Sequence, residues 1–398
     1  MKVLYSLFLS FIGSYLVLSA TLVFAEQYFP KPEYLGGWRK NTAPDFIASL
    51  GLDPVAVKQF GKYNLSVKSA EFASAIVIKD GYIIGEWYSA REARKTEIYL
   101  SSVGKTFAMA CFGIVVKDSK DGIIPHHING QSKVYDPRWL NSGFPLSDNR
   151  KDSITFNHIF THTSGLAPQE TKEGKPVEEG RYHWSDYLQW VVGHDELWPQ
   201  TKPLYFHPGK PESWFGHDQW GEHKAAYSSV GFSHIGLALS ELYGVPADHL
   251  LWNRLLQPIG FSGISFHRPP TPPEIKWSTE GGLKMTPRDF ARFAYFLLND
   301  GRWEKQQILP EDWLQQFVTT PYYNNLRSNS DKFFGKQYPT TMYRIFGSGG
   351  NLAFIIPDHN MIVLRTGRVH NFFHKILQRD FLRRAFYMIP GFSIETNG

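Results

Sequence analysis

The chain has 398 residues, of which 42% are hydrophobic, enough to form one large domain or two sub-domains that share an interface. The formal net charge is only +5 and no long run of like charge occurs, so the sequence does not suggest a nucleic-acid partner. The single cysteine, Cys111, excludes an intrachain disulfide and lies in an apolar stretch, where we expect a small buried side chain, not a reactive thiol.

Residues 1–25 have the pattern of an export signal. Lys2 supplies a positive start, a long apolar stretch follows, and the small side chain of Ala25 suits cleavage after it. We therefore predict a signal peptide over residues 1–25 and an exported mature protein that is periplasmic or secreted. The apolar stretch is also long enough to cross a bilayer, so an uncut anchor in the inner membrane, formed by residues 3–25, is the alternative.

The next segments predict a surface strap, a helix, a hairpin and a second helix. Residues 26–50 are rich in proline, glycine and aromatic side chains, which is typical of a strap, and residues 53–67 predict a short amphipathic helix. Two β-branched runs on either side of Lys79-Asp80-Gly81 predict a tight hairpin. An apolar helix follows and begins near Ser102.

The middle of the chain differs in character from both ends. Residues 117–275 carry most of the prolines and histidines, with helical patterns starting at Ser185 and Val230. Further on, Thr286 and Pro287 open a well-marked helix. The last segments predict two or three antiparallel strands over residues 340–367 and a closing helix over residues 372–389.

Because strands occur toward both ends of the mature chain, we predict one α/β (α+β) domain over residues 26–398. A central antiparallel sheet would be flanked by helices, with a mainly helical sub-domain inserted. The sheet sub-domain would comprise residues 51–116 and 276–398, and the helical and loop sub-domain residues 117–275.

A serine and a lysine stand three residues apart at the start of the apolar helix. Ser102 and Lys105 would share one face of that helix, at the positive end of its dipole. An uncharged amine there can take the serine proton and activate the hydroxyl for acyl transfer. A chain of this length contains roughly one or two Ser-x-x-Lys matches by chance. The alternative is therefore that Ser101 or Ser102 only caps the helix and is followed by a solvated lysine.

Two later segments can complete such a site. Tyr227 precedes a short polar pair and a helix, and a phenol near the serine and lysine could hold or relay a proton. A Gly-rich bend leads into a strand at Asn351, where the backbone can approach a ligand. The amides of Ser102 and Asn351 could then form an oxyanion hole. The alternatives are an ordinary core tyrosine and an ordinary turn.

Together these motifs resemble the serine β-lactamase and penicillin-binding-protein superfamily. The resemblance points to the branch that holds class C β-lactamases, esterases, amidases and 6-aminohexanoate-oligomer hydrolases. It runs from about Ala73 to about Gly367 and includes the segments His158–Leu166 and Gly281–Trp303. It implies a β-lactamase/transpeptidase-like fold.

The resemblance also implies roles for individual residues. Ser102 would be the nucleophile, Lys105 its base, and Tyr227 the group that passes a proton to the leaving group and later activates the deacylating water. The bend would form the edge of the cleft, with an oxyanion amide from Asn351. The other implied contributors to substrate binding are Ser229, Ser348, Gly349 and Gly350.

Two departures from the family pattern bear on the substrate. Ser229 stands where these proteins usually have asparagine, and Ser348 stands where lactamases and transpeptidases have lysine and many relatives have histidine or tryptophan. The cation that would bind the carboxylate of a β-lactam or of peptidoglycan is thus missing. We therefore expect an exported serine hydrolase that cleaves an ester or amide bond of an uncharged or hydrophobic acyl substrate. The aromatic side chains between Tyr182 and Tyr227 agree with an aromatic-lined cleft, or with a well-filled core.

Several alternatives remain at this point. The chain could be a β-lactamase or D,D-peptidase acting on cell-wall-like amides, or a non-catalytic ligand- or peptide-binding member of the same fold. A D-amino-peptidase would need an anionic subsite, for which Asp218 and Glu222 are candidates. His158 and His162 have the spacing of helical zinc ligands but no intervening glutamate. We predict a small-molecule ester or amide substrate, no cofactor, no metal and no nucleic acid, and membrane contact only through an uncut N-terminal segment.

Overall fold

The computed structural model describes residues 27–67, 72–146, 148–168, 204–210, 226–266, 277, 279–318, 326–329, 332–369 and 374–393. These are called the described residues below. The predicted signal segment, the predicted helix from Ser185 and most of the aromatic stretch between Tyr182 and Tyr227 lie outside them. So do Asp218 and Glu222.

A six-stranded antiparallel sheet forms the centre of the fold, in the order β2-β1-β11-β10-β9-β8. Strands β1 and β11 pair along their whole length, from Ser74 opposite Thr366 to Lys79 opposite Met361. Strands from both ends of the chain therefore build one sheet, which confirms the predicted fold class; the limits of the two sub-domains stay a prediction. The bounds are β1 Ser74–Lys79, β2 Tyr82–Tyr88, β8 Leu326–Ser328, β9 Tyr343–Gly347, β10 Asn351–Ile356 and β11 Met361–Thr366.

Short strands stand apart from the main sheet. A three-stranded sheet pairs β3 (Ile98–Tyr99) with β5 (Leu283–Met285), and β5 with β4 (Ser265–Phe266). A small hairpin pairs β6 (Arg302–Trp303) with β7 (Gln306–Gln307). The β3–β5 pairing lays the segment that leads into β5 beside the residues that lead into Ser102.

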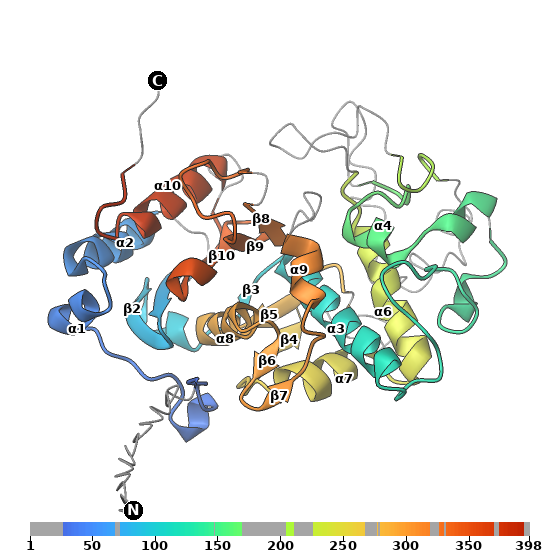
Figure 1. Ribbon diagram of the computed structural model, residues 1–398, viewed down its shortest axis with the longest axis horizontal. Helices are drawn as coiled ribbons and strands as arrows, with labels where there is room; N and C mark the ends of the chain where they lie inside the picture. Colours follow the sequence, from blue (N-terminus) through green and yellow to red (C-terminus); the bar gives the residue numbers. More distant parts are fainter. Residues whose placement is uncertain are drawn as a thin grey trace, which may run out of the picture.

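Helices cover both faces of the main sheet (Figure 1). Helices α2 and α10 pack on one face, while α3 and α8 pack on the other, with α6 and α7 behind α3. The side chains of β1 alternate accordingly: Ile76 and Ile78 face α8, whereas Ala75 and Val77 face α2 and α10. The bounds are α1 Pro44–Ser49, α2 Pro54–Ser66, α3 Val103–Lys120, α4 Phe156–Phe160, α6 Ser229–Tyr243, α7 Ala247–Leu251, α8 Pro287–Leu298, α9 Trp313–Val318 and α10 His374–Phe386.

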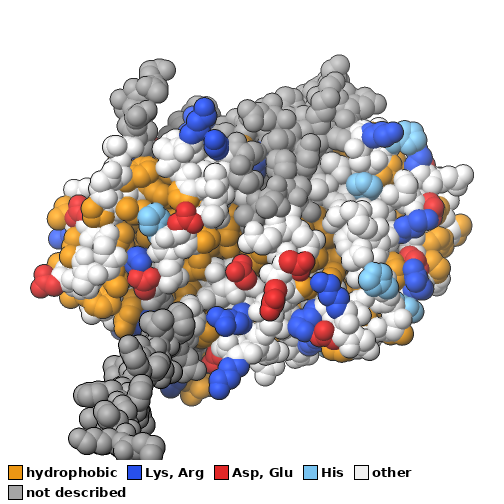
Figure 2. All heavy atoms as spheres, in the orientation of Figure 1, with side chains coloured by type: hydrophobic (Ala, Val, Ile, Leu, Met, Phe, Trp, Pro, Cys, Tyr) orange, Lys and Arg blue, Asp and Glu red, His pale blue; other side chains and the backbone are white. Residues whose placement is uncertain are grey.

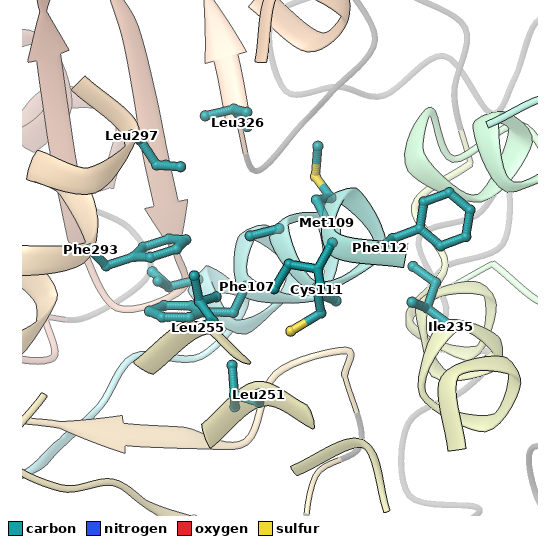
Figure 3. Close-up of a cluster of buried hydrophobic side chains, with 14 of the residues drawn as sticks. Phe107, Met109, Cys111, Phe112, Ile235, Leu251, Leu255, Phe293, Leu297 and Leu326 are labelled. Carbon is teal, nitrogen blue, oxygen red and sulfur yellow. The ribbon is translucent and has the colours of Figure 1, made fainter. Parts of the chain in front are cut away.

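Helix α3 is buried on all sides except in its last turn. Every residue from Val103 to Val116 is buried, which explains why this stretch is apolar all round and not along a single stripe. Figure 3 shows α3 in a central position, with Ile235 of α6, Leu251 of α7, Phe293 of α8 and Leu326 of β8 around it. Cys111 is fully buried among them, and burial raises the pKa of its thiol, as expected for an inert core residue. A rigid central helix holds the residues at its N-terminus in a fixed place.

The predicted strap is confirmed and is tied down by arginines. Arg292 of α8 donates to the carbonyl of Pro30 over 2.6 Å, and Arg288 pairs with Glu33 at 2.7 Å. The strap ends in a short helix, α1, that the sequence reading did not predict. No helix among the described residues is long and apolar enough to cross a bilayer. On the face shown in Figure 2, acidic and basic side chains are interspersed.

Candidate active site

Ser102 occupies the first position before α3, but its hydroxyl does not cap the helix. Ser102 Oγ instead accepts a hydrogen bond from the Tyr227 hydroxyl over 2.8 Å and one from Lys105 Nζ over 3.4 Å. The preceding residue, Ser101, has a φ of +53°, a left-handed conformation that is uncommon for a residue with a side chain. The interpretation of Ser102 as a plain helix cap is therefore wrong.

Lys105 is fully buried, so the alternative of a solvated lysine is also wrong. Its Nζ donates to the Glu280 carbonyl over 2.6 Å, to Ser229 Oγ over 3.3 Å and to Ser102 Oγ over 3.4 Å. The Glu280 carboxylate lies 3.8 Å from the same nitrogen. A buried amine needs such partners, because burying an unpaired charge costs several kcal/mol. These contacts also aim the amine at the serine oxygen.

Tyr227 is held from behind by His162. The two rings stack with their centroids 4.3 Å apart, and Lys105 Nζ lies 4.8 Å from the centroid of the tyrosine ring. The Ala226 amide donates to the His162 carbonyl over 2.9 Å, and the Ser228 amide donates to His162 Nδ1 over 3.1 Å. His162 thus fixes both residues that flank Tyr227 in sequence.

The sequence reading missed this positioning role, although it had singled out the segment His158–Leu166. His158 lies elsewhere: its Nδ1 accepts from the Thr155 amide at the start of α4, and burial lowers the pKa of its ring. His158 and His162 have the spacing of helical zinc ligands, but their rings contact different segments. The His158 ring contacts the start of α4, and the His162 ring contacts the residues around Tyr227. The signal that could have identified His162 was its place in the Thr-His-Thr-Ser-Gly-Leu segment.

The two serines after Tyr227 have different tasks. Ser228 caps α6, since its Oγ accepts from the Gly231 amide over 3.0 Å and donates to the Ala167 carbonyl over 2.8 Å. Ser229 Oγ is directed at Lys105. A hydroxyl at position 229 can therefore accept a hydrogen bond from the lysine, a contact that an asparagine oxygen could also make.

The Gly-rich bend between β9 and β10 lies beside the loop that carries Ser102. A Cβ on Gly347 would come within 2.1 Å of the Leu100 carbonyl oxygen, so only glycine permits this approach. Gly349 and Gly350 have φ angles of +88° and +82°, which also favour glycine.

Asn351 anchors this bend with its side chain. Its Nδ2 donates to the carbonyls of Tyr99, over 3.2 Å, and Ser348, over 3.1 Å, while its Oδ1 accepts from the Gly367 amide over 3.0 Å. The Ser348 side chain is exposed at the turn. The structure thus brings Ser348, Gly349, Gly350 and Asn351 to the segment that carries Ser102; their part in substrate and oxyanion binding stays a prediction.

The sequence reading also missed Glu280. Its segment is pressed against the first turn of α3: a Cβ on Gly104 would lie 2.7 Å from Gly281 Cα, and one on Gly281 would lie 3.2 Å from the Ser101 oxygen. Thr279 has a φ of +55°, a strained conformation for a β-branched residue, and its Oγ1 donates to the Phe232 carbonyl over 2.7 Å. The Gly281-Gly282 pair was the only signal in the sequence for this close contact.

The architecture is that of the serine hydrolases of β-lactamase and penicillin-binding-protein type. EstCE1, a hydrolase with promiscuous acyltransferase activity, matches with a TM-score of 0.59 at 14% identity, over 86% of this chain and 100% of that one. A penicillin-binding-protein homologue from Caulobacter crescentus gives 0.56 at 14% identity, over 83% and 93%. A protein from Bacillus anthracis described as a 6-aminohexanoate-dimer hydrolase gives 0.56 at 14% identity, over 83% and 81%.

At these identities the structural likeness shows the fold alone. The family follows from the sequence: the model of the Beta-lactamase family matches residues 69–371, and the chain belongs to that family. No curated protein sequence matches it. The resemblance drawn from the motifs is thereby confirmed, and the chain is a β-lactamase-related protein of a serine hydrolase family.

Proposed function

We propose that this protein hydrolyses an ester or amide bond through an acyl-enzyme on Ser102. The observation that carries the proposal is the convergence of two proton-carrying groups on one oxygen: the Tyr227 hydroxyl at 2.8 Å and Lys105 Nζ at 3.4 Å from Ser102 Oγ. A serine oxygen that only caps a helix accepts hydrogen bonds from backbone amides and does not need a base or a proton carrier beside it. Nucleophilic serines, by contrast, need an adjacent base and a proton carrier.

Acylation would proceed in two stages. Lys105, in its uncharged form, takes the Ser102 proton while Oγ attacks the substrate carbonyl, and the negative charge on the carbonyl oxygen develops near the N-terminus of α3. Tyr227 then donates a proton to the leaving alcohol or amine as its bond to the carbonyl carbon breaks, and recovers a proton from the Lys105 ammonium. The result is an ester on Ser102 and a neutral leaving group.

The charges at the site favour an uncharged acyl group. Ser348, which stands where lactamases place a lysine, is neutral. The Glu280 carboxylate lies 3.8 Å from Lys105 Nζ, so a substrate carboxylate at the lysine would meet a negative charge beside it. We therefore favour a neutral or hydrophobic ester or amide over a β-lactam or a peptidoglycan peptide.

The test is the intact mass of the protein after treatment with a fluorophosphonate, which forms a serine–phosphorus bond and releases fluoride. We expect one adduct on the wild type, none on Ser102→Ala, and one on the control Ser66→Ala, whose serine lies at the exposed end of α2. A well-folded wild type without an adduct would refute the activated serine and would favour a ligand-binding member of the fold.

We further propose that the protein acts outside the cytoplasm. The support is the signal-like pattern of residues 1–25, with cleavage expected before Glu26. The mass of the untreated protein from its native host tests this directly. Loss of residues 1–25 supports a periplasmic or secreted enzyme, whereas a full-length mass supports anchoring by residues 3–25.

A further inference from the structure

Glu280 places a carboxylate at the catalytic lysine, in a position that the sequence motifs do not assign. Its Oε2 lies 3.8 Å from Lys105 Nζ, the nitrogen that also reaches Ser102 Oγ at 3.4 Å. The side chain is 13% exposed, whereas that of Lys105 is fully buried. Solvent therefore reaches the carboxylate but not the amine.

The backbone on both sides of Glu280 is held in place. Gly281, the next residue, touches the first turn of α3, and Trp277 Nε1 donates to the Gly281 carbonyl over 3.0 Å. On the other side, Thr279 has its left-handed φ and is bonded to α6 through the Phe232 carbonyl and the Gly236 amide. A strained residue held by two hydrogen bonds is typical of a functional site.

Breakdown of an acyl-enzyme needs a proton donor and a proton acceptor. The donor must face Ser102 Oγ, the leaving oxygen, and both Tyr227 and Lys105 donate to that atom. The acceptor must take a proton from the attacking water. A carboxylate only accepts hydrogen bonds, so Glu280 is suited to orient a water and remove its proton.

We propose that Glu280, and not Tyr227 as the family resemblance implies, is the general base of deacylation, a role that rests on the proposed function. The water oxygen bonds to the acyl carbon and its proton passes to the Glu280 carboxylate. The bond between that carbon and Ser102 Oγ then breaks, and Oγ takes a proton from Lys105 or Tyr227. The carboxylic acid product leaves, and Glu280 returns its proton to the depleted donor, which restores the resting site.

The test separates acylation from deacylation with p-nitrophenyl butyrate. Rapid-mixing kinetics of Glu280→Gln should show a burst of about one p-nitrophenol per enzyme, then a steady rate reduced about 100-fold or more. Intact mass should show the butyryl-enzyme, while fluorophosphonate labelling stays within about threefold of the wild-type rate. The matched control is Glu311→Gln, an exposed glutamate before α9, which should behave as the wild type.

Two further variants guard against an effect on folding or positioning. Glu280→Asp keeps the carboxylate and should recover part of the steady rate, and added formate should accelerate deacylation of Glu280→Ala. If Glu280 only held Lys105 in place, Glu280→Gln would slow labelling and turnover together, without accumulation of acyl-enzyme. That result would overturn the inference. Unchanged turnover of Glu280→Gln would also overturn it. A wild type that is neither labelled nor active would refute the proposed function itself.

Discussion

The contact between Gly104 and Gly281 allows the placement of Lys105 to be perturbed without changing any polar group. In Gly104→Ala, the new methyl group would lie 2.7 Å from Gly281 Cα and 2.8 Å from the Gly281 oxygen. Carbon atoms in good contact are about 3.5–4.0 Å apart, so the segment must recede by roughly 0.8 Å. The obstacle is backbone and not the end of a flexible side chain, and it therefore cannot swing aside.

The displacement would act on Lys105 through Glu280. Its carbonyl accepts from Lys105 Nζ at 2.6 Å, and a recoil of roughly 0.8 Å would take that bond to the limit of hydrogen-bonding distance. A misplacement of about 1 Å near a reacting group can cost about 100-fold in rate. We expect kcat/KM of Gly104→Ala to fall about 10- to 100-fold, which corresponds to about 1.4–2.7 kcal/mol of transition-state stabilisation.

The assay is ester hydrolysis corrected for folded protein, combined with urea unfolding. Gly113→Ala is the matched control, because it lies in the same helix and its methyl group would meet the Trp313 indole at 2.6 Å, away from the site. Both variants gain about 1 kcal/mol of helix propensity and lose about 1–3 kcal/mol through overpacking. Gly113→Ala should lower the free energy of unfolding and leave kcat/KM unchanged. Wild-type kcat/KM in folded Gly104→Ala would refute the argument that this contact positions the lysine.

Two other predictions concern the proton carriers and the acid stability of the fold. Lys105→Ala and Tyr227→Phe should each lower kcat/KM about 100-fold or more, and near-normal activity in either would remove that residue from the mechanism. Burial alone would raise the pKa of Glu86, but hydrogen bonds and charge from Arg288 and Lys40 lower it to about 2, from 4.5. Because the folded pKa is the lower one, this carboxylate stabilises the fold above about pH 4.5, and that contribution is lost as the pH falls toward 2. Glu86→Gln should therefore show up to about 3 kcal/mol less acid destabilisation between pH 5 and 2, measured as the free energy of unfolding in urea at each pH. Equal pH profiles would contradict this.

The sheet and the central helix could be predicted because their signals are local. The β-branched runs around Asp80-Gly81 predict a hairpin whatever the rest of the chain does, and Asp80 and Gly81 both have the positive φ that such a turn needs. Helix α3 is similarly evident from its apolar run. Helix α1 was missed because six residues give too short a pattern to separate from the proline-rich strap around them.

The candidate site could be predicted only as far as its residues carry motifs. Ser102, Lys105 and Tyr227 were found because a helix spacing and the order of segments along the chain connect them. The role of His162 depends on a ring stack with Tyr227, and that contact joins residues that no periodicity links. Its residue type fits many roles, so the sequence alone could not choose among them.

The contact between Glu280 and Lys105 could not be predicted from the sequence. The lysine and this glutamate come together because two glycines let the backbones of α3 and the 279–282 segment nearly touch. The acid lies 175 residues after the lysine and precedes a glycine pair that by itself indicates only a turn. A carboxylate brought to an amine in this way changes both the charge that a substrate meets and the groups that can move protons. The Gly104→Ala and Glu280→Gln variants should therefore affect different steps. The first displaces the lysine and should slow acylation, while the second replaces the carboxylate with an uncharged amide of similar size and should slow deacylation.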